Sequence, residues 1–166
     1  SKAKLLEVFA MKLKLAELTE PYAKEICDWK YDDEYSIYNY HEWNKASNEK
    51  WSITIEDKRK KEFSAVVDDY NNLCGYIRLQ DKKEHVLIGI GLKSSLCGQG
   101  LGSTLMELLK QKCRELYPSK KITLEVRCFN ERAIKCYKRA GFKIKETYKK
   151  DTPIGYGEFI RMEFSS

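Results

Sequence analysis

Apolar and polar residues follow two different periods along the first third of the chain. In "KLKLAEL" (12–18) they alternate one by one, which predicts a strand. The segment "TEPYAKEICDWKY" (19–31) then begins with Thr19 in the position of a helix cap and has a proline in its first turn, as helix starts often do. An aromatic-rich stretch follows, and we expect it to lead into a short helix that ends near Trp51.

The middle of the chain predicts a hairpin and a third strand. The apolar runs "FSAVVDD" (63–69) and "LCGYIRLQD" (73–81) flank turn-forming residues. In "EHVLIGIGLK" (84–93) one face is apolar, whereas the other carries Leu87, Gly89 and Gly91. Glycines on a strand face indicate either that a ligand lies against the backbone or that a bulge or an aromatic ring fills the space.

The last third alternates helices and strands. Leucines at helical spacing predict a helix that runs from the glycine-rich segment before residue 101 and stops before Pro118, and "KITLEVRCF" (121–129) predicts a strand. Asn130 can cap the next helix, and Gly141 is placed to end it. Two strands complete the chain. We therefore expect an α/β (α+β) three-layer α/β/α fold around a mixed, mostly antiparallel sheet of about six to seven strands, with about four helices.

Length and composition fit one ordinary globular domain. The chain has 166 residues, of which 42% are hydrophobic and 34% charged. We assign residues 11–166 to a single domain and residues 1–10 to an N-terminal extension or an expression remnant. No apolar run approaches the roughly 20 residues that span a bilayer, so we expect no membrane association.

The charged residues and the cysteines indicate which ligands and binding partners to expect. The net charge of +6 favours anionic ligands, but basic residues are spread out and only "KRKK" (58–61) clusters, which we expect in a solvated loop. Without a dense basic stripe we expect no nucleic-acid binding. The six cysteines form no C-x-x-C pair, and His41 and His85 lie far apart, so we expect no metal, reduced thiols and a cytoplasmic protein.

The segment "SLCGQGLGSTL" (95–105) places three glycines directly before a predicted helix. Such loops usually bind phosphates, because free backbone N–H groups and the helix dipole both favour an anion. A Walker loop would need a lysine after its last glycine, where Ser103 stands. A dinucleotide fingerprint would need a glycine at position 103 and an acid at the end of the following strand, whereas Glu125 lies in the strand's middle.

A third spacing fits better. The segment "CGQGLG" (97–102) resembles the acetyl-CoA pyrophosphate loop of the GNAT superfamily of N-acetyltransferases, Gln/Arg-x-x-Gly-x-Gly/Ala, except that Cys97 replaces the usual Gln or Arg. The segment "LEVRCFNERAIKCYKRAGF" (124–142) is similar to a second stretch of that family, Asn-x-x-Ala-x-x-x-Tyr-x-x-x-Gly-Phe. Its Leu-Glu-Val-Arg strand resembles the ribosomal-protein alanine N-acetyltransferases most closely.

The resemblance implies a sheet with a central splay and direct transfer of an acetyl group from acetyl-CoA to a primary amine in a ternary complex, without metal. It makes Glu125 the general base and Tyr137 the general acid. The alternative for Glu125 is a strand carboxylate that pairs with Arg127 or a lysine. The alternative for Tyr137 is an aromatic residue of the core. The residues implied in cofactor binding are Ile90, Gly91, Leu92, Cys97, Gly98, Gln99, Gly100, Leu101, Gly102, Ser103, Asn130 and Tyr137. Asn130 would contact the pantetheine arm, cap its helix, or do both.

The acceptor amine is less defined by the sequence. Carboxylates among aromatic rings suit a cationic amine, and we expect Tyr31, Asp32 and Tyr35 to bind the acceptor. It would be a small amine or a peptide N-terminus, unless this segment is simply a solvated acidic helix end. A non-catalytic acyl-CoA sensor on the same fold is the alternative function. Both a monomer and a homodimer fit the sequence.

Overall fold

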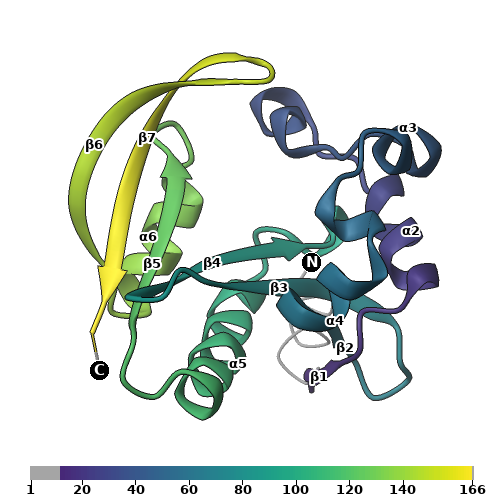
Figure 1. The fold of residues 1–166 in the computed structure, drawn as a ribbon, viewed down its shortest axis with the longest axis horizontal. Coiled ribbons are helices and arrows are strands. Elements are labelled where there is room, and N and C mark those ends of the chain that lie inside the picture. The colour runs from purple at the N-terminus through teal and green to yellow at the C-terminus, as the bar shows by residue number, and fades with distance from the viewer. Residues whose placement is uncertain (1–11, 166) are drawn as a thin grey trace. The chain divides into compact units, whose positions relative to one another are not determined.

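The computed structural model describes residues 12–165, so the expectation for residues 1–10 lies outside the described residues. Seven strands form one sheet in the order β1-β2-β3-β4-β5-β7-β6 (Figure 1). Its strands are β1 (Lys14–Ala16), β2 (Phe63–Val67), β3 (Leu73–Asp81), β4 (His85–Leu92), β5 (Lys121–Arg127), β6 (Lys143–Thr152) and β7 (Gly155–Phe164). Strands β4 and β5 pair in parallel, whereas β1–β2, β2–β3, β5–β7 and β6–β7 are antiparallel.

The helices of the described residues lie between these strands in sequence. They are α2 (Glu20–Asp28), α3 (Trp43–Asn48), α4 (Glu56–Glu62), α5 (Leu101–Leu116) and α6 (Glu131–Arg139), with short 3₁₀ helices η1 (Asp33–Tyr38), η2 (Ser52–Thr54) and η3 (Ser94–Leu96). The expected α/β class and the mixed sheet of about seven strands are thus confirmed. The helices of the described residues exceed the expected four, because a further helix, α4, follows the short helix that was expected to end near Trp51.

The chain forms two compact units. Unit 1 holds residues up to Arg78 together with Ile90–Leu101, and unit 2 holds Leu79–Gly89 together with the residues from Gly102 onward. The single-domain assignment stays a prediction. Among residues 12–165 there is no helix long and apolar enough to cross a bilayer. The cytoplasmic location and the oligomeric state also stay predictions.

Unit 1 is built around the start of α2 and the hairpin β2–β3. Thr19 caps α2 as expected, since its hydroxyl accepts a hydrogen bond from the backbone N–H of Tyr22 at 3.4 Å. All five residues of β2 are buried. The core of unit 1 contains Leu18, Ala23, Ile26, Cys27, Trp29, Ile53, Phe63, Ala65, Val67 and Leu73.

The basic run at residues 58–61 is a helix, so the expectation of a solvated loop was wrong. It lies within α4, where Lys60 pairs with Glu56 at 3.1 Å across one turn. Arg59 is only 6% exposed and donates from Nη1 to the carbonyl oxygen of Ile53 at 3.0 Å. Acidic residues in the first turn and basic residues in the last stabilise this helix despite its few apolar residues.

Unit 2 contains α6 and three antiparallel neighbouring strands in the order β5–β7–β6, of which β6 and β7 form the long hairpin at the yellow end of the chain in Figure 1. Asn130 caps α6 by accepting from the N–H of Ala133 at 3.2 Å, and Gly141 ends it with a φ of +98°. Both helix signals predicted from the sequence are confirmed. Leu124 and Val126 of β5 are buried, and Glu125 between them is exposed.

Candidate functional site

The glycine-rich turn before α5 has the backbone conformation that its composition indicated. Gly98 and Gly100 have φ angles of +75° and +83°, a region that residues with a side chain rarely adopt. A Cβ atom on Gly100 would meet no atom within 4 Å. The glycine is therefore needed there for the angle and not for lack of space, and the residue is exposed.

Gly102 has a different reason for lacking a side chain. It lies in the first turn of α5, and a Cβ atom there would be 2.9 Å from the Sγ atom of Cys136 on α6. The third glycine thus permits the close approach of two helices within unit 2. Of the three glycines, Gly98 and Gly100 are the two that shape the turn.

Two side chains of the turn form hydrogen bonds to backbone carbonyl oxygens that precede it. The Cys97 thiol lies 3.7 Å from the carbonyl oxygen of Leu92 and 3.6 Å from that of Lys93, and donates to both. Gln99 donates from Nε2 to the carbonyl oxygen of Ser95 at 3.0 Å. Cys97 therefore contacts backbone carbonyl groups at and just after the end of β4. It does not provide the amide or cationic side chain that is usual at this position in the family that the turn resembles. Gly98 and Gly100 are exposed. The expected role of this turn in cofactor binding stays a prediction.

An aromatic ring covers Gly91 on β4. A Cβ atom on Gly91 would lie 2.1 Å from a ring carbon of Tyr76. The Tyr76 ring in turn stacks on Trp29, with ring centroids 6.2 Å apart. Of the two alternatives for this glycine-bearing face, the structure therefore favours the packed ring at Gly91 over a ligand.

The three residues expected to bind the acceptor lie together at the start of η1 in unit 1. The Tyr31 hydroxyl donates to the carbonyl oxygen of Leu92 at 2.7 Å, and its backbone N–H donates to Oδ1 of Asn39 at 2.7 Å. Burial raises the pKa of Tyr31 above its usual value, so the phenol remains a donor. Asp32 is exposed, and its carbonyl oxygen accepts from the N–H of Tyr35 at 3.1 Å. Tyr31 thus fastens this segment to the end of β4.

Glu125 of unit 2 has two partners on β6. Tyr148 donates a hydrogen bond from its hydroxyl to Oε2, and the Lys150 Nζ lies 2.6 Å from Oε1. Pairing of Glu125 with a lysine was one alternative expected from the sequence, but neither Tyr148 nor Lys150 was expected as its partner. They could not be found from motif spacing, because β6 and β5 are separated by β7 in the sheet.

Phe159 of β7 lies beneath this charged group. It is 5% exposed, although its face of the sheet is polar. The Tyr148 ring stacks on it at 6.1 Å and 21°, and the cationic ends of Lys150 and Arg127 lie 4.8 and 4.7 Å from its centroid. The Tyr148 ring and the cationic ends of Lys150 and Arg127 therefore cover Phe159.

Tyr137 lies on α6 in unit 2 and is 9% exposed. Its ring centroid is 6.2 Å from that of Phe142, at an angle of 59°. This packing agrees with a core role for the ring, and the expected acid role of its hydroxyl stays a prediction. Asn130, at the start of the same helix, does cap it.

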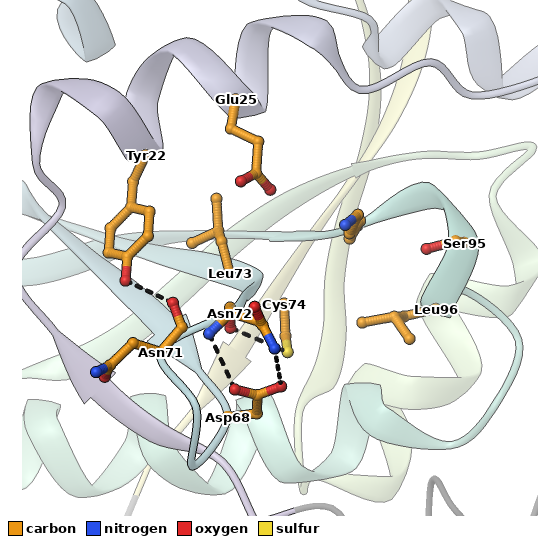
Figure 2. A pocket seen from close by; sticks show the side chains of 10 residues that line it. Tyr22, Glu25, Asp68, Asn71, Asn72, Leu73, Cys74, Ser95 and Leu96 are labelled. Atoms are coloured by element: carbon orange, nitrogen blue, oxygen red, sulfur yellow. Dashed lines mark hydrogen bonds between the residues drawn. The ribbon is translucent and has the colours of Figure 1, made fainter.

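A cavity of about 320 Å³ lies in unit 1, and Lys93, Ser95 and Leu96, which line part of it, stand in the chain between the predicted site residues Leu92 and Cys97 (Figure 2). On its floor Asp68 accepts from the N–H and the side-chain amide of Asn72 at 2.9 and 3.1 Å. The Glu25 carboxylate points into it, and its Oε2 atom is buried with no hydrogen-bond partner among the described residues. Within residues 12–165, no group of three or more His, Cys, Asp or Glu side chains could hold a metal ion.

The chain matches a known protein family and several solved structures. The sequence profile of the Acetyltransferase (GNAT) family matches residues 22–142. A putative acetyltransferase from Acinetobacter baylyi is 16% identical, with a TM-score of 0.72 and 94% of each chain covered. Spermidine N-acetyltransferase from Vibrio cholerae, in complex with CoA and spermine, is 19% identical, with a TM-score of 0.68 over 92% of this chain and 94% of that one.

The ribosomal-protein-S18-alanine N-acetyltransferase from Escherichia coli has a similar fold. It is 19% identical, with a TM-score of 0.65 over 92% of this chain and 93% of that one. At these identities the solved structures establish a shared fold. No curated protein sequence matches the chain.

Proposed function

Because the chain belongs to the GNAT family of acetyltransferases, we propose that it transfers an acetyl group from acetyl-CoA directly to a primary amine. The observation that best supports this is the turn at Gly98 and Gly100, whose positive φ angles precede the 16-residue helix α5. Main-chain N–H groups at a helix start favour an anion through hydrogen bonds and the helix dipole. The residues that would hold the diphosphate are those from Gly98 to Ser103.

The end of β4 would hold the acetyl-bearing arm of the cofactor. In this proposal the backbone of Ile90 hydrogen-bonds the pantetheine, and the N–H of Leu92 donates to the oxygen that gains negative charge during transfer. Fixed donors of this kind are effective because they need no reorganisation during the reaction. The hydrogen bonds from Tyr31 and Cys97 to the Leu92 carbonyl oxygen support such a fixed backbone.

Two side chains of unit 2 would move the protons. Bound acetyl-CoA supplies an activated thioester, but the acceptor amine must lose a proton before it attacks. We assign that proton to Glu125, directly or through a water molecule. Tyr137 would donate a proton to the departing sulfur, whose thiol has a pKa near the ~8.5 of cysteine.

The acceptor is proposed to be a cationic amine, either a small molecule or a peptide N-terminus. Tyr31, Asp32 and Tyr35 bring a carboxylate and two aromatic side chains together in one short segment, a combination that attracts ammonium groups. The similar solved structures include one bound to spermine and one named for a ribosomal-protein alanine. Both kinds of acceptor therefore belong in the first experiment.

That experiment measures release of the CoA thiol from acetyl-CoA in the presence of amines, amino sugars and peptides with free N-termini. We expect release that depends on one of these classes and rises with acceptor concentration. Glu125→Gln is the comparison variant. Acetyl-CoA binding by calorimetry without thiol release across the panel would contradict the proposal and favour an acyl-CoA sensor.

The base role of Glu125 has its own test in the pH dependence of kcat/KM. Without the carboxylate, reaction depends on amine that is already unprotonated in solution, so the pH optimum of Glu125→Gln should move to higher pH. Glu158→Gln is the control, because Glu158 is an exposed carboxylate that pairs with Lys149 at 3.4 Å. A Glu125→Gln profile that overlays that of the wild type would contradict the base role.

A further inference from the structure

The contacts of Glu125 follow from the register of three neighbouring strands in unit 2. Glu125 of β5 lies opposite Arg161 of β7, which lies opposite Glu146 of β6. Residues two apart on a strand share a face, so Tyr148 and Lys150 lie on the same face as Glu146. From there both reach across β7 to the Glu125 carboxylate, one to each oxygen.

We propose that Tyr148 and Lys150 are positioning residues for Glu125, which fix the orientation of its carboxylate. The proposal rests on the base role given to Glu125 above. A carboxylate that takes a proton from an amine must be aimed in one direction. Two contacts, one on each of its oxygens, limit rotation of the group.

The other charged groups of this face have different partners. Arg161 donates to Glu146 at 3.2 Å and to Glu163, although it lies opposite Glu125 in register. Arg127, two residues along β5, lies over the Phe159 ring. Tyr148 and Lys150 are therefore the direct partners of the carboxylate that the structure records in unit 2.

The two partners are held in place themselves. Tyr148 stacks on Phe159, and the Lys150 ammonium lies over the same ring. Burial and the hydrogen bond to Glu125 both raise the pKa of Tyr148, so its hydroxyl keeps its proton and remains a donor throughout the working pH range. The aromatic ring thus provides the rigid support that a positioning contact needs.

The test compares kcat and KM for Tyr148→Phe and Lys150→Met at a saturating concentration of acetyl-CoA. Each change removes one of the two contacts that orient the carboxylate. We expect kcat to fall by roughly tenfold in each variant while the KM for the acceptor stays unchanged, because a misaligned base slows proton removal without weakening substrate binding. Lys150→Arg keeps the cation and should restore most of the wild-type kcat.

The chain offers a matched control for each variant. Lys149→Met removes a neighbouring lysine that pairs with Glu158 instead of Glu125. Tyr156→Phe removes a hydroxyl from a tyrosine that is 76% exposed. Both controls should keep the wild-type kcat. If Tyr148→Phe and Lys150→Met keep it as well, while Glu125→Gln does not, the positioning role is wrong and the base role stands.

A second measurement does not depend on activity or on the identity of the acceptor. The ¹³C resonances of the glutamate side-chain carboxylates are recorded by NMR at one fixed pH, and the Glu125 signal is assigned by its loss in Glu125→Gln. Because Tyr148 and Lys150 contact the two carboxylate oxygens, the Glu125 signal should move in Tyr148→Phe and in Lys150→Met and stay in place in both controls. An unmoved signal in all four variants would contradict the proposal even if the enzymatic assay failed.

Discussion

The turn at residues 97–102 and the polar face of β5, β7 and β6 differ in what carries their proposed function. In the turn, backbone conformation matters: Gly98 and Gly100 have positive φ angles, and nothing lies near the missing side chain of Gly100. On the polar face, side chains matter, since Glu125 is held by residues more than twenty positions away in sequence. Binding by the turn should therefore respond to backbone strain, and chemistry at the face to the loss of single polar atoms.

The largest expected effect concerns a single side-chain atom. Tyr137→Phe removes one oxygen from a buried ring and should lower kcat by roughly 10²-fold or more, the usual scale for a lost proton-transfer group. Steady-state kinetics with a saturating acceptor measure it, with Tyr156→Phe as control. Because the ring still packs against Phe142, thermal stability should change little. An unchanged kcat would leave Tyr137 as a core residue.

A glycine outside the turn should respond through packing instead of conformation. Gly91→Ala places a methyl group 2.1 Å from the Tyr76 ring, so the ring or the strand must move. We expect unfolding by urea to show a loss of about 1–3 kcal/mol, the range for overpacked sites. A second change, Tyr76→Leu, should recover part of it by removing the ring. Full stability of Gly91→Ala alone would contradict the packing explanation.

Gly100 and Gly155 have similar positive φ angles, and they test whether backbone conformation in the turn matters for binding. Gly100→Ala and Gly155→Ala both put a side chain at positive φ, at +83° and +106°, with no atom within 4 Å to clash. Each should cost roughly 1–2 kcal/mol of conformational energy. Relief of that strain in the turn moves its N–H groups, so Gly100→Ala should weaken acetyl-CoA binding by about tenfold in calorimetry. Gly155→Ala should bind like the wild type.

The smallest effect is expected at a helix cap. Asn130→Ala removes the hydrogen bond to the N–H of Ala133 and should lower the free energy of unfolding by about 1 kcal/mol. Asn130→Asp keeps an acceptor and should remain close to the wild type. If Asn130→Ala lowers acetyl-CoA affinity without lowering stability, the residue contacts the cofactor as well as capping α6.

Features that depend on neighbouring residues could be predicted from the sequence. The cap at Thr19, the end of α6 at Gly141 and the strained turn before α5 each follow from local backbone requirements. The helix at residues 56–62 was missed because i,i+4 ion pairs, not an apolar stripe, stabilise it. Its buried Arg59 is bonded to a carbonyl oxygen, which composition does not reveal.

Features that depend on register and packing could not be predicted. The ring over Gly91 comes from Tyr76, fifteen residues earlier, and one sequence offers no sign of which aromatic residue will fill the space. Tyr148 and Lys150 look like ordinary residues of a polar strand. Only the order β5-β7-β6 and its register bring them to Glu125. The family resemblance was thus enough to propose Glu125 as the base, but not to identify the contacts of its carboxylate.

The most direct test of the central claim compares two ligands that differ in the diphosphate. Calorimetry would measure the binding of acetyl-CoA and of S-acetylpantetheine, which lacks the diphosphate and the nucleotide, to the wild type and to Gly100→Ala. If the turn binds the diphosphate, Gly100→Ala will weaken acetyl-CoA binding and leave S-acetylpantetheine binding unchanged. Equal losses for both ligands, or no loss for acetyl-CoA, would contradict the account.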